Sequence, residues 1–439
     1  MKTGEHYQVK IEKLVAKGKG MARLEDKVVF VPYVLPEETA EIVITGIKKD
    51  YLLAHKVSIL TPSPFRVTPL CPVFELCGGC QWQMIDYPDQ LKIKLDLLKE
   101  SLHRTGKIDP EVLNPAPSPH PFYYRQRVKF HTSFHNGKIV IGFLRSESKE
   151  IVAVQHCLII NPLLNSLLEK VFVLLNQTPD LFQTLREMSF SLAAPENEIF
   201  IELKMKEFPV KDTLIHDFLK FPLKIKGVII TLENNSRKVF GENRIFHLLQ
   251  NPSNSQEMMK IRNSAGVFSQ VNREVNLKLI ETLFSWARLS GKERVLELYS
   301  GQGNFTLLLA KSSFHLTAVE ENPLAIEDLK VNLQINQIKN CSVRKEKSQT
   351  VLKRWDKTKF PLDILILDPP REGIDGSSIE SILRIRPSRI YYISCDPATL
   401  ARDLKVLSKN YDIIRVAPFD MFPQTAHLET LTELHLKGH

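Results

Sequence analysis

The pattern of hydrophobic and polar residues changes twice along the chain. Residues 7–60 form short alternating segments broken by Gly- and Pro-containing turns, which predicts a small β-barrel with Lys and Arg on its turns. Strand-like and helix-like segments mix between residues 123 and 246, and this mixture predicts an α+β domain. From residue 293 onward strands and helices alternate, which predicts a parallel, doubly wound α/β sheet.

The length of the chain and two Pro-rich breaks, TPSPFRVTPLCP and NPAPSPHPF, support a division into domains. A chain of 439 residues is too long for one ordinary core. We expect an OB-like barrel over residues 1–62, a central α+β domain over 63–262 and a Rossmann-like catalytic domain over 263–439. Amphipathic helices are expected over about Asp89–Arg104 and over 272–289, the second leading into the last domain.

The composition narrows the class of protein. Hydrophobic residues make up 43% and charged residues 25% of the chain, which is typical of a globular protein. The net charge of +9 favours a polyanionic partner, because Lys and Arg near phosphates release counterions. No apolar segment has the length of a signal-peptide core at the start or of a membrane span elsewhere. We therefore expect a cytoplasmic protein without membrane association and, since no extra apolar face is obvious, a monomer.

A glycine-rich turn marks a candidate cofactor site. The segment RVLELYSGQGNFTLLLA places Gly301 and Gly303 between a strand and a helix, at the strand end where open α/β sheets bind ligands. Glu320 closes the next strand, where a carboxylate can accept hydrogen bonds from two ribose hydroxyls. The turn is neither GxGxxG nor a Walker motif, so it favours S-adenosylmethionine; a tight turn with a solvated Glu is the alternative reading.

Three residues at later strand boundaries suit the methylation of a pyrimidine. Asp368, Cys395 and Glu429 are each expected at the cofactor edge of the sheet. A thiolate that adds to carbon 6 makes carbon 5 nucleophilic, and a base must then remove the carbon 5 proton. A Cys and a Glu supply these two groups. Considered alone, however, a Cys is more often a buried hydrophobic residue and a Glu on a strand is more often a surface carboxylate.

A cluster of cysteines indicates a metal site. Cys71, Cys77 and Cys80 have the spacing Cys-x5-Cys-x2-Cys, and Cys157 can supply a fourth ligand. Four thiolates suit either zinc or a [4Fe–4S] cluster, and the spacing alone does not choose between them. Cys341 is expected in the core.

Five segments together resemble the RNA uracil-5-methyltransferase family: SCDPATLARD, LDPPREG, LYSGQGNFTL, GVFSQVN and FPQTAHLET. The resemblance runs through the whole last domain and implies that Cys395 is the nucleophile and Glu429 the base. It also implies a set of S-adenosylmethionine-binding positions, namely Gln270, Tyr299, Gly301, Gly303, Asn304, Glu320 and Asp368.

The chain departs from the family pattern at three positions. Asp396 stands where many members have Asn, and Tyr299 replaces a common Phe. Lys347 occupies a position where members often carry an Asn or Asp for the adenine, so that contact is left unassigned, with Glu346 as a substitute.

The resemblance extends to the rest of the chain. The N-terminal barrel resembles the TRAM RNA-binding module, and the cysteine spacing resembles that of cluster-bearing ribosomal RNA enzymes, which implies a structural [4Fe–4S] cluster on Cys71, Cys77, Cys80 and Cys157. The segment YYRQRVKFH interleaves aromatic and basic residues as RNA-binding strands do, and its predicted RNA contacts are Arg125, Arg127 and Lys129.

The predicted function is S-adenosylmethionine-dependent methylation of carbon 5 of a uridine in structured RNA. The barrel and the cysteines favour 23S rRNA over transfer RNA, because the simplest transfer RNA enzymes of the family lack both. Three alternatives stay open: a transfer RNA uracil-5 enzyme, an RNA cytosine-5 enzyme and a non-catalytic RNA-binding assembly factor. LDPPREG lacks the Pro-Cys nucleophile usual in similar cytosine enzymes, and the intact Cys395 and Glu429 argue against a relic enzyme.

Overall fold

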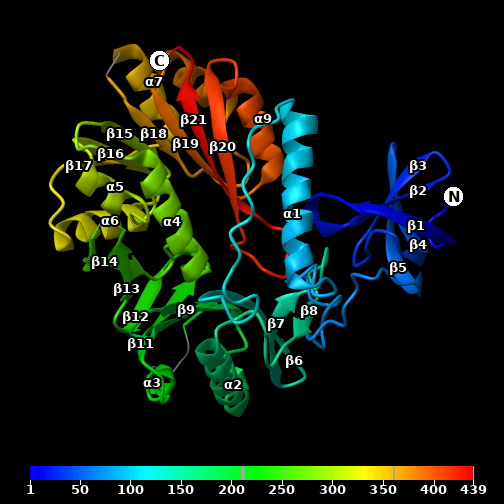
Figure 1. Cartoon of the computed structure of the whole chain (residues 1–439). Coiled ribbons are helices and arrows are strands. Elements are labelled where there is room, and N and C mark those ends of the chain that lie inside the picture. The colour runs from blue at the N-terminus through cyan, green and yellow to red at the C-terminus, as the bar shows by residue number, and fades with distance from the viewer. Residues whose placement is uncertain (209–212, 253, 359–360, 439) are drawn as a thin grey trace.

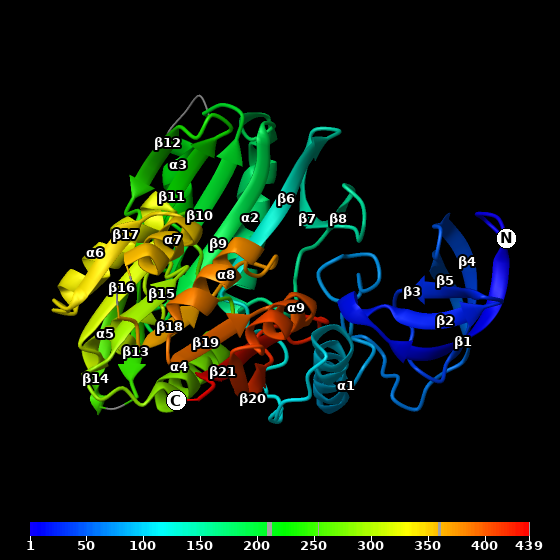
Figure 2. The same cartoon turned by 90° about the horizontal axis from the view of Figure 1, so that it is seen from above.

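The computed structural model describes residues 1–208, 213–252, 254–358 and 361–438. In this part of the chain a closed barrel, a seven-stranded central sheet, a two-stranded hairpin and a seven-stranded C-terminal sheet follow one another. The barrel lies at one end of the molecule in both views, and helix α1 (Tyr87–Ser101) stands between it and the C-terminal sheet (Figures 1 and 2). In these described residues no helix is both long and apolar enough to cross a membrane.

The expected N-terminal barrel is confirmed, with five strands in the order β1-β2-β3-β5-β4. Its strands are β1 (His6–Leu14), β2 (Gly20–Leu24), β3 (Lys27–Val31), β4 (Thr39–Ile47) and β5 (Tyr51–Thr61). Strand β2 lies in a segment expected to be a Gly-rich turn. Gly20 allows the strand to pack closely against Val34, since a Cβ at this position would come within 2.3 Å of Val34 Cγ2.

The central sheet has the order β12-β11-β10-β9-β6-β7-β8. Its strands are β6 (Arg127–His135), β7 (Lys138–Leu144), β8 (Ile151–Ala153), β9 (Leu185–Ala193), β10 (Glu198–Met205), β11 (Ile225–Leu232) and β12 (Arg237–Gly241). Helices α2 (Pro162–Gln177) and α3 (Thr213–Leu219) share one hydrophobic core with it, as expected of an α+β arrangement. A separate hairpin of β13 (Arg244–Asn251) and β14 (Asn254–Ser264) leads on to helix α4 (Arg273–Ala287).

The C-terminal sheet has the order β17-β16-β15-β18-β19-β21-β20. Its strands are β15 (Arg294–Leu298), β16 (His315–Glu320), β17 (Cys341–Lys345), β18 (Ile364–Leu367), β19 (Arg389–Ser394), β20 (Tyr411–Phe419) and β21 (Glu429–Leu436). The expected parallel sheet has one antiparallel strand, because β21 runs antiparallel to both β19 and β20. No helix separates β20 from β21, and two adjacent strands joined by a short loop pair antiparallel.

Helices cover both faces of this sheet, so the doubly wound arrangement is confirmed. One hydrophobic core contains α4, α5 (Thr306–Ser312) and α6 (Pro323–Ile335). The other contains α7 (Ser348–Thr358), α8 (Gly376–Ile385) and α9 (Pro397–Leu407), together with Leu98 of α1. Alternate residues of the buried strands enter the two cores, which leaves the strand ends free to form a site.

Candidate active site

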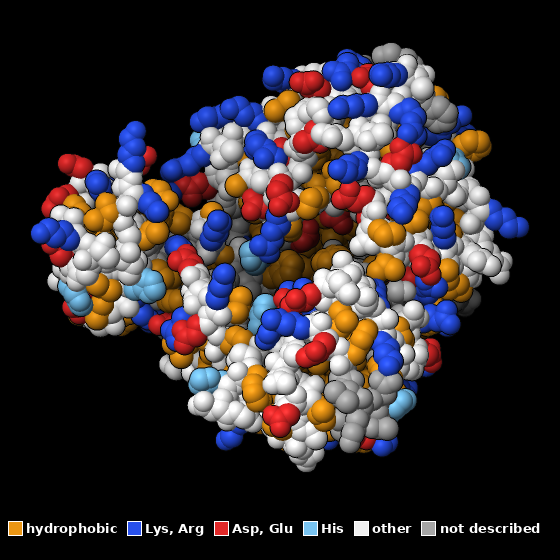
Figure 3. Space-filling model, turned by 180° about the vertical axis from the view of Figure 1, so that it is seen from behind, with side chains coloured by type: hydrophobic (Ala, Val, Ile, Leu, Met, Phe, Trp, Pro, Cys, Tyr) orange, Lys and Arg blue, Asp and Glu red, His pale blue; other side chains and the backbone are white. Residues whose placement is uncertain are grey.

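A cavity of about 870 Å³ lies at the carboxyl edge of the C-terminal sheet. Seven of the predicted catalytic and cofactor-binding residues line it, namely Gln270, Tyr299, Gly301, Glu320, Asp368, Cys395 and Glu429. Seen from the side opposite to Figure 1, the molecule is hollowed near its centre, with hydrophobic and acidic side chains in the hollow and Lys and Arg side chains around it (Figure 3).

Cys395 and Glu429 are brought together by the pairing of β19 with β21. Ser394 pairs with Thr430, and the Thr430 hydroxyl donates to the Ser394 carbonyl oxygen at 3.0 Å. Cys395, which directly follows β19, and Glu429, the first residue of β21, therefore lie side by side at this edge of the sheet. This happens only because β21 is antiparallel, so that its first residue lies at the edge where β19 ends.

Asp396 begins helix α9 directly after the cysteine. Its carboxylate accepts hydrogen bonds from the backbone N–H groups of Ala398 and Thr399, at 2.9 and 3.0 Å. Asn and Asp serve equally well at such an N-cap, which accounts for the departure from the family pattern at this position. The start of α9 also places a helix N-terminus beside Cys395, an arrangement that favours a thiolate.

The titratable groups of the cavity influence one another. Burial raises the pKa of the Cys395 thiol to about 12, the Glu429 carboxylate adds to the rise, and the Arg371 guanidinium opposes it. Burial also raises the pKa of Asp368 to about 7, with a further contribution from Glu320. The pKa of Glu429 is raised well above its usual value by burial and by Asp368. Carboxyl groups shifted in this direction are suited to exchange protons near neutral pH.

Arg371 is a residue of this site to which the sequence assigned no role. It lines the cavity, and its Nη2 lies 3.5 Å from Nε2 of His427. Burial and Arg371 lower the pKa of His427 to about 4, so this imidazole is neutral at physiological pH. Phe422 and Phe268 also line the cavity without having been predicted. The motifs LDPPREG, FPQTAHLET and GVFSQVN contain these residues, but only the tertiary structure places their side chains.

The glycine-rich turn fits a nucleoside-containing cofactor. Glu320 is held by three backbone N–H groups, those of Gly301, Glu321 and Asn322, at 3.0, 2.9 and 2.8 Å. Gly301 has φ +55° and no atom within 4 Å of the position of a Cβ, so the backbone is open for a ligand there. At Gly303, with φ +102°, a Cβ would come within 2.8 Å of Leu329 Cδ1, so this glycine serves helix packing.

Two predicted cofactor residues do not line the main cavity. Asn304 lines a smaller cavity of about 50 Å³, in which Gln270 also takes part, and its side chain exchanges hydrogen bonds of 2.8 and 3.1 Å with Asn276. Gly303 lines neither cavity. Lys347 and Glu346 both line the main cavity, and the Glu346 carboxylate is paired with Arg354.

The four cysteines of the predicted metal site lie in one neighbourhood. Burial raises the pKa of Cys80 to about 12, and the thiols of Cys157, Cys77 and Cys71 add to the rise. Within the described ranges, however, no three His, Cys, Asp or Glu side chains are grouped so that they could hold a metal ion. The Cys77 sulfur instead accepts a hydrogen bond from the backbone N–H of Gly79 at 3.4 Å. The four thiols are a donor set of the kind that suits zinc or a [4Fe–4S] cluster.

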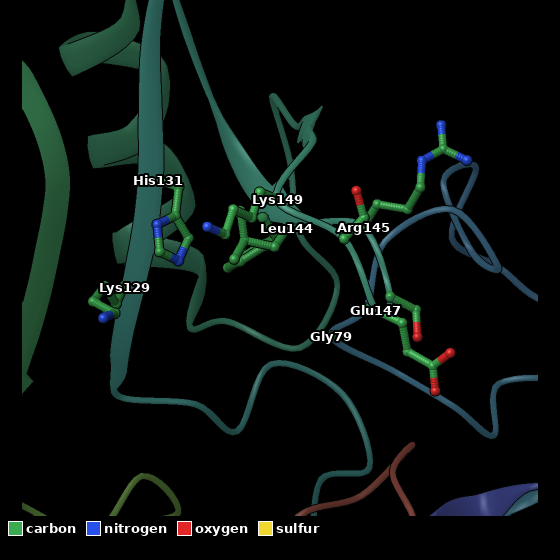
Figure 4. A pocket seen from close by; sticks show the side chains of 11 residues that line it. Gly79, Lys129, His131, Leu144, Arg145, Glu147 and Lys149 are labelled. Carbon is green, nitrogen blue, oxygen red and sulfur yellow. The ribbon is translucent and has the colours of Figure 1, made fainter.

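The side chains of the three predicted RNA contacts lie in different parts of the structure. Arg125 lines the main cavity, whereas Arg127 donates to the Val267 carbonyl oxygen at 2.6 Å. Lys129 lines a second, open cavity of about 710 Å³, which Gly78 and Gly79 beside the cysteines also line, and its ammonium group is paired with Glu187. In Figure 4 Lys129 and His131 follow one strand and Lys149 extends toward them.

Comparisons with known proteins agree with this architecture. The family model described as tRNA (uracil-5-)-methyltransferase matches residues 86–437, and the TRAM domain model matches residues 1–57. An uncharacterized RNA methyltransferase of Listeria innocua is 31% identical over 100% of this chain and 99% of its own length. A second one, from Thermosynechococcus vestitus, is 33% identical over 98% of each chain.

A solved structure shows the same fold. It is the Pyrococcus abyssi tRNA (uracil-54, C5)-methyltransferase in complex with S-adenosyl-L-homocysteine, with a TM-score of 0.75, 23% identity, and coverage of 98% of this chain and 100% of that one. The family model covers most of the chain, and its motifs meet in one cavity. The chain therefore belongs to the tRNA (uracil-5-)-methyltransferase family of S-adenosylmethionine-dependent RNA (uracil-5-)-methyltransferases.

Proposed function

We propose that this protein methylates carbon 5 of a specific uridine in RNA through a covalent bond between Cys395 and carbon 6 of the base. The observation that carries the proposal is the position of Cys395 and Glu429 at adjoining ends of β19 and β21, in one cavity with Asp368 and Glu320. The reaction needs a nucleophile and a base that act on the same pyrimidine ring, and here both groups lie at adjoining strand ends.

In the proposed reaction the Cys395 thiol gives its proton to solvent and the thiolate adds to carbon 6, which opens the carbon 5–carbon 6 double bond and makes carbon 5 a nucleophile. S-adenosylmethionine, when bound, would supply the methyl group that carbon 5 takes and would leave as S-adenosylhomocysteine. Glu429 then accepts the carbon 5 proton, the carbon 5–carbon 6 double bond forms again, and the Cys395 thiolate leaves. Arg371 opposes the rise in the pKa of both Cys395 and Glu429, so its positive charge favours the ionised forms that the two steps require.

The cofactor would be held by residues already arranged around the glycine-rich turn. Glu320, fixed by its three backbone donors, would accept hydrogen bonds from the ribose hydroxyls, and Tyr299 would pack beside the nucleoside. Gln270, which takes part in both cavities, and Asn304 would hold the methionyl end. Asp368 follows β18, which lies in the sheet between β15 with the cofactor turn and β19 with Cys395, so it would contact both the cofactor and the uracil.

We propose large-subunit ribosomal RNA as the substrate, because the chain combines the barrel with the four cysteines. The Lys and Arg side chains around the hollow suit an RNA backbone, and a base must leave its stack to reach Cys395 (Figure 3). The second candidate is transfer RNA. It is favoured by the Pyrococcus enzyme, which by its name acts on transfer RNA and shares the fold over 98% of this chain.

Nucleoside analysis of RNA from cells that lack this gene tests the reaction and the substrate together. Loss of 5-methyluridine from ribosomal RNA, with normal 5-methyluridine in transfer RNA, is the expected result. Loss from transfer RNA alone would move the substrate to that class. Loss of 5-methylcytidine instead would indicate a cytosine enzyme, and no change in either nucleoside would indicate a non-catalytic binding factor.

We further propose a [4Fe–4S] cluster on Cys71, Cys77, Cys80 and Cys157. Protein purified without oxygen should be brown and contain about four iron atoms and four sulfides per chain. Cys77→Ala should lose most of this iron, whereas Cys341→Ala, a change in strand β17 outside the four-cysteine neighbourhood, should keep it. A colourless protein with one zinc ion per chain would refute the cluster and leave a zinc site in its place.

A further inference from the structure

The loop between β20 and β21, residues 420–428, is held by several distant parts of the chain. This loop contributes Phe422 to the cavity and ends at Glu429, the proposed base. Helix α1 supplies the principal side chains that hold the loop. Two of the three buried residues of α1, Gln90 and Lys94, are polar, which is costly in a helix face unless they have partners.

Gln424 is at the centre of these contacts. It is 3% exposed and has φ +67°, a left-handed conformation that is unfavourable for a residue with a side chain. Its backbone N–H donates to Gln90 Oε1, and Gln90 Nε2 donates to its side-chain oxygen, both at 3.0 Å. Its carbonyl oxygen accepts from the backbone N–H groups of Gln81 and Trp82, both at 3.1 Å. The surrounding structure therefore determines this strained conformation completely.

A buried ion pair fixes the beginning of the same loop. Lys94 and Asp420 are both fully buried, with 2.6 Å between Nζ and Oδ1, and Lys94 also donates to the Phe422 carbonyl oxygen at 3.1 Å. The Tyr124 hydroxyl donates to the Pro423 carbonyl oxygen at 3.2 Å. The loop is thus attached at four of its positions, 420, 422, 423 and 424, to α1, to the backbone of residues 81 and 82 and to Tyr124.

We propose that Gln90 and Gln424 form a clamp that positions Glu429 for removal of the carbon 5 proton. The inference rests on the proposed role of Glu429 as the base. Only four residues separate Gln424 from Glu429, and proton transfer requires the base to lie within hydrogen-bond reach of the proton. The conformation of Gln424 sets the path of the chain that leads into Glu429, the first residue of β21, whereas Cys395 follows β19 and does not depend on these contacts. The clamp therefore acts on the last step of the reaction and not on the first.

Gln424→Gly is the direct test, because glycine accepts the left-handed conformation and loses the side-chain bond to Gln90. The probe is a large-subunit ribosomal RNA transcript with tritium at carbon 5 of its uridines, used with isotopically labelled S-adenosylmethionine in a single turnover. Tritium release should slow by roughly 10- to 100-fold, while methyl transfer changes by less than about 3-fold. A methylated protein–RNA adduct should accumulate in consequence.

Gln90→Ala removes the two side-chain bonds to Gln424 together with those to the Trp82 and Ile85 carbonyl oxygens, and it should give the same separation of the two steps. Lys92→Ala on the same helix is the matched control, because Lys92 is 74% exposed and its side chain pairs with Asp89. Thermal unfolding and cofactor binding report separately whether each variant is folded. If tritium release and methyl transfer fell together in folded Gln424→Gly, or if neither changed, the clamp would be refuted. If the unaltered enzyme released no tritium from ribosomal or transfer RNA transcripts, the proposed function itself would fail.

Discussion

Cys395→Ala should abolish methyl transfer to RNA, with a fall in rate of roughly 10⁴-fold or more, and should leave binding of S-adenosylmethionine unchanged. Without the sulfur, carbon 5 of the pyrimidine never becomes nucleophilic, so no other residue can rescue the step. The proposed ribose-binding Glu320 closes β16 and the glycine-rich turn follows β15, so neither should be altered by the loss of one sulfur atom after β19.

Two measurements check this prediction: incorporation of labelled methyl groups into ribosomal RNA, and calorimetric titration with S-adenosylmethionine. Cys341→Ala is the matched control, because Cys341 stands on β17 and does not line the cavity. Substantial methylation by the Cys395→Ala variant would exclude the covalent mechanism. Loss of cofactor binding would show instead that the substitution had disturbed the site as a whole.

Glu429→Gln should permit addition and methyl transfer but stall the release of product. The amide has the size of the carboxyl group and cannot accept the carbon 5 proton, so the Cys395–carbon 6 bond cannot be broken by elimination. Release should slow by roughly 10²- to 10⁴-fold, and close to one RNA molecule per enzyme should remain attached after denaturation. The adduct can be followed on denaturing gels with labelled RNA, and the modified peptide should contain Cys395.

The double variant Cys395→Ala/Glu429→Gln serves as the control, because it lacks the sulfur and should form no adduct. If Glu429→Gln turned over normally, another group would be the base. Asp368 would be the first to test, since it lines the same cavity and burial raises its pKa to about 7.

Much of the fold could be predicted from local sequence patterns. Alternation of apolar residues with a period of two fixed the barrel strands, and the alternation of strands and helices fixed the doubly wound sheet, because both patterns are read over a few neighbouring residues. Strand β2 escaped prediction because its glycine was read as a turn signal, whereas Gly20 is required by the approach of Val34 from elsewhere in the barrel. The bounds of the three domains and the cluster ligands stay predictions.

The sequence by itself determined the chemical groups of this protein: a thiol, a set of carboxyl groups and a glycine-rich turn at strand ends. Only the tertiary structure decided how they meet. Strand β21 enters the sheet antiparallel between β19 and β20, and this direction alone brings Glu429 to the edge where Cys395 lies. Arg371 and the contacts of Gln90 with Gln424 likewise depend on segments far apart in the chain. Contacts of this kind depend on packing between distant segments, which a local pattern of residues cannot predict.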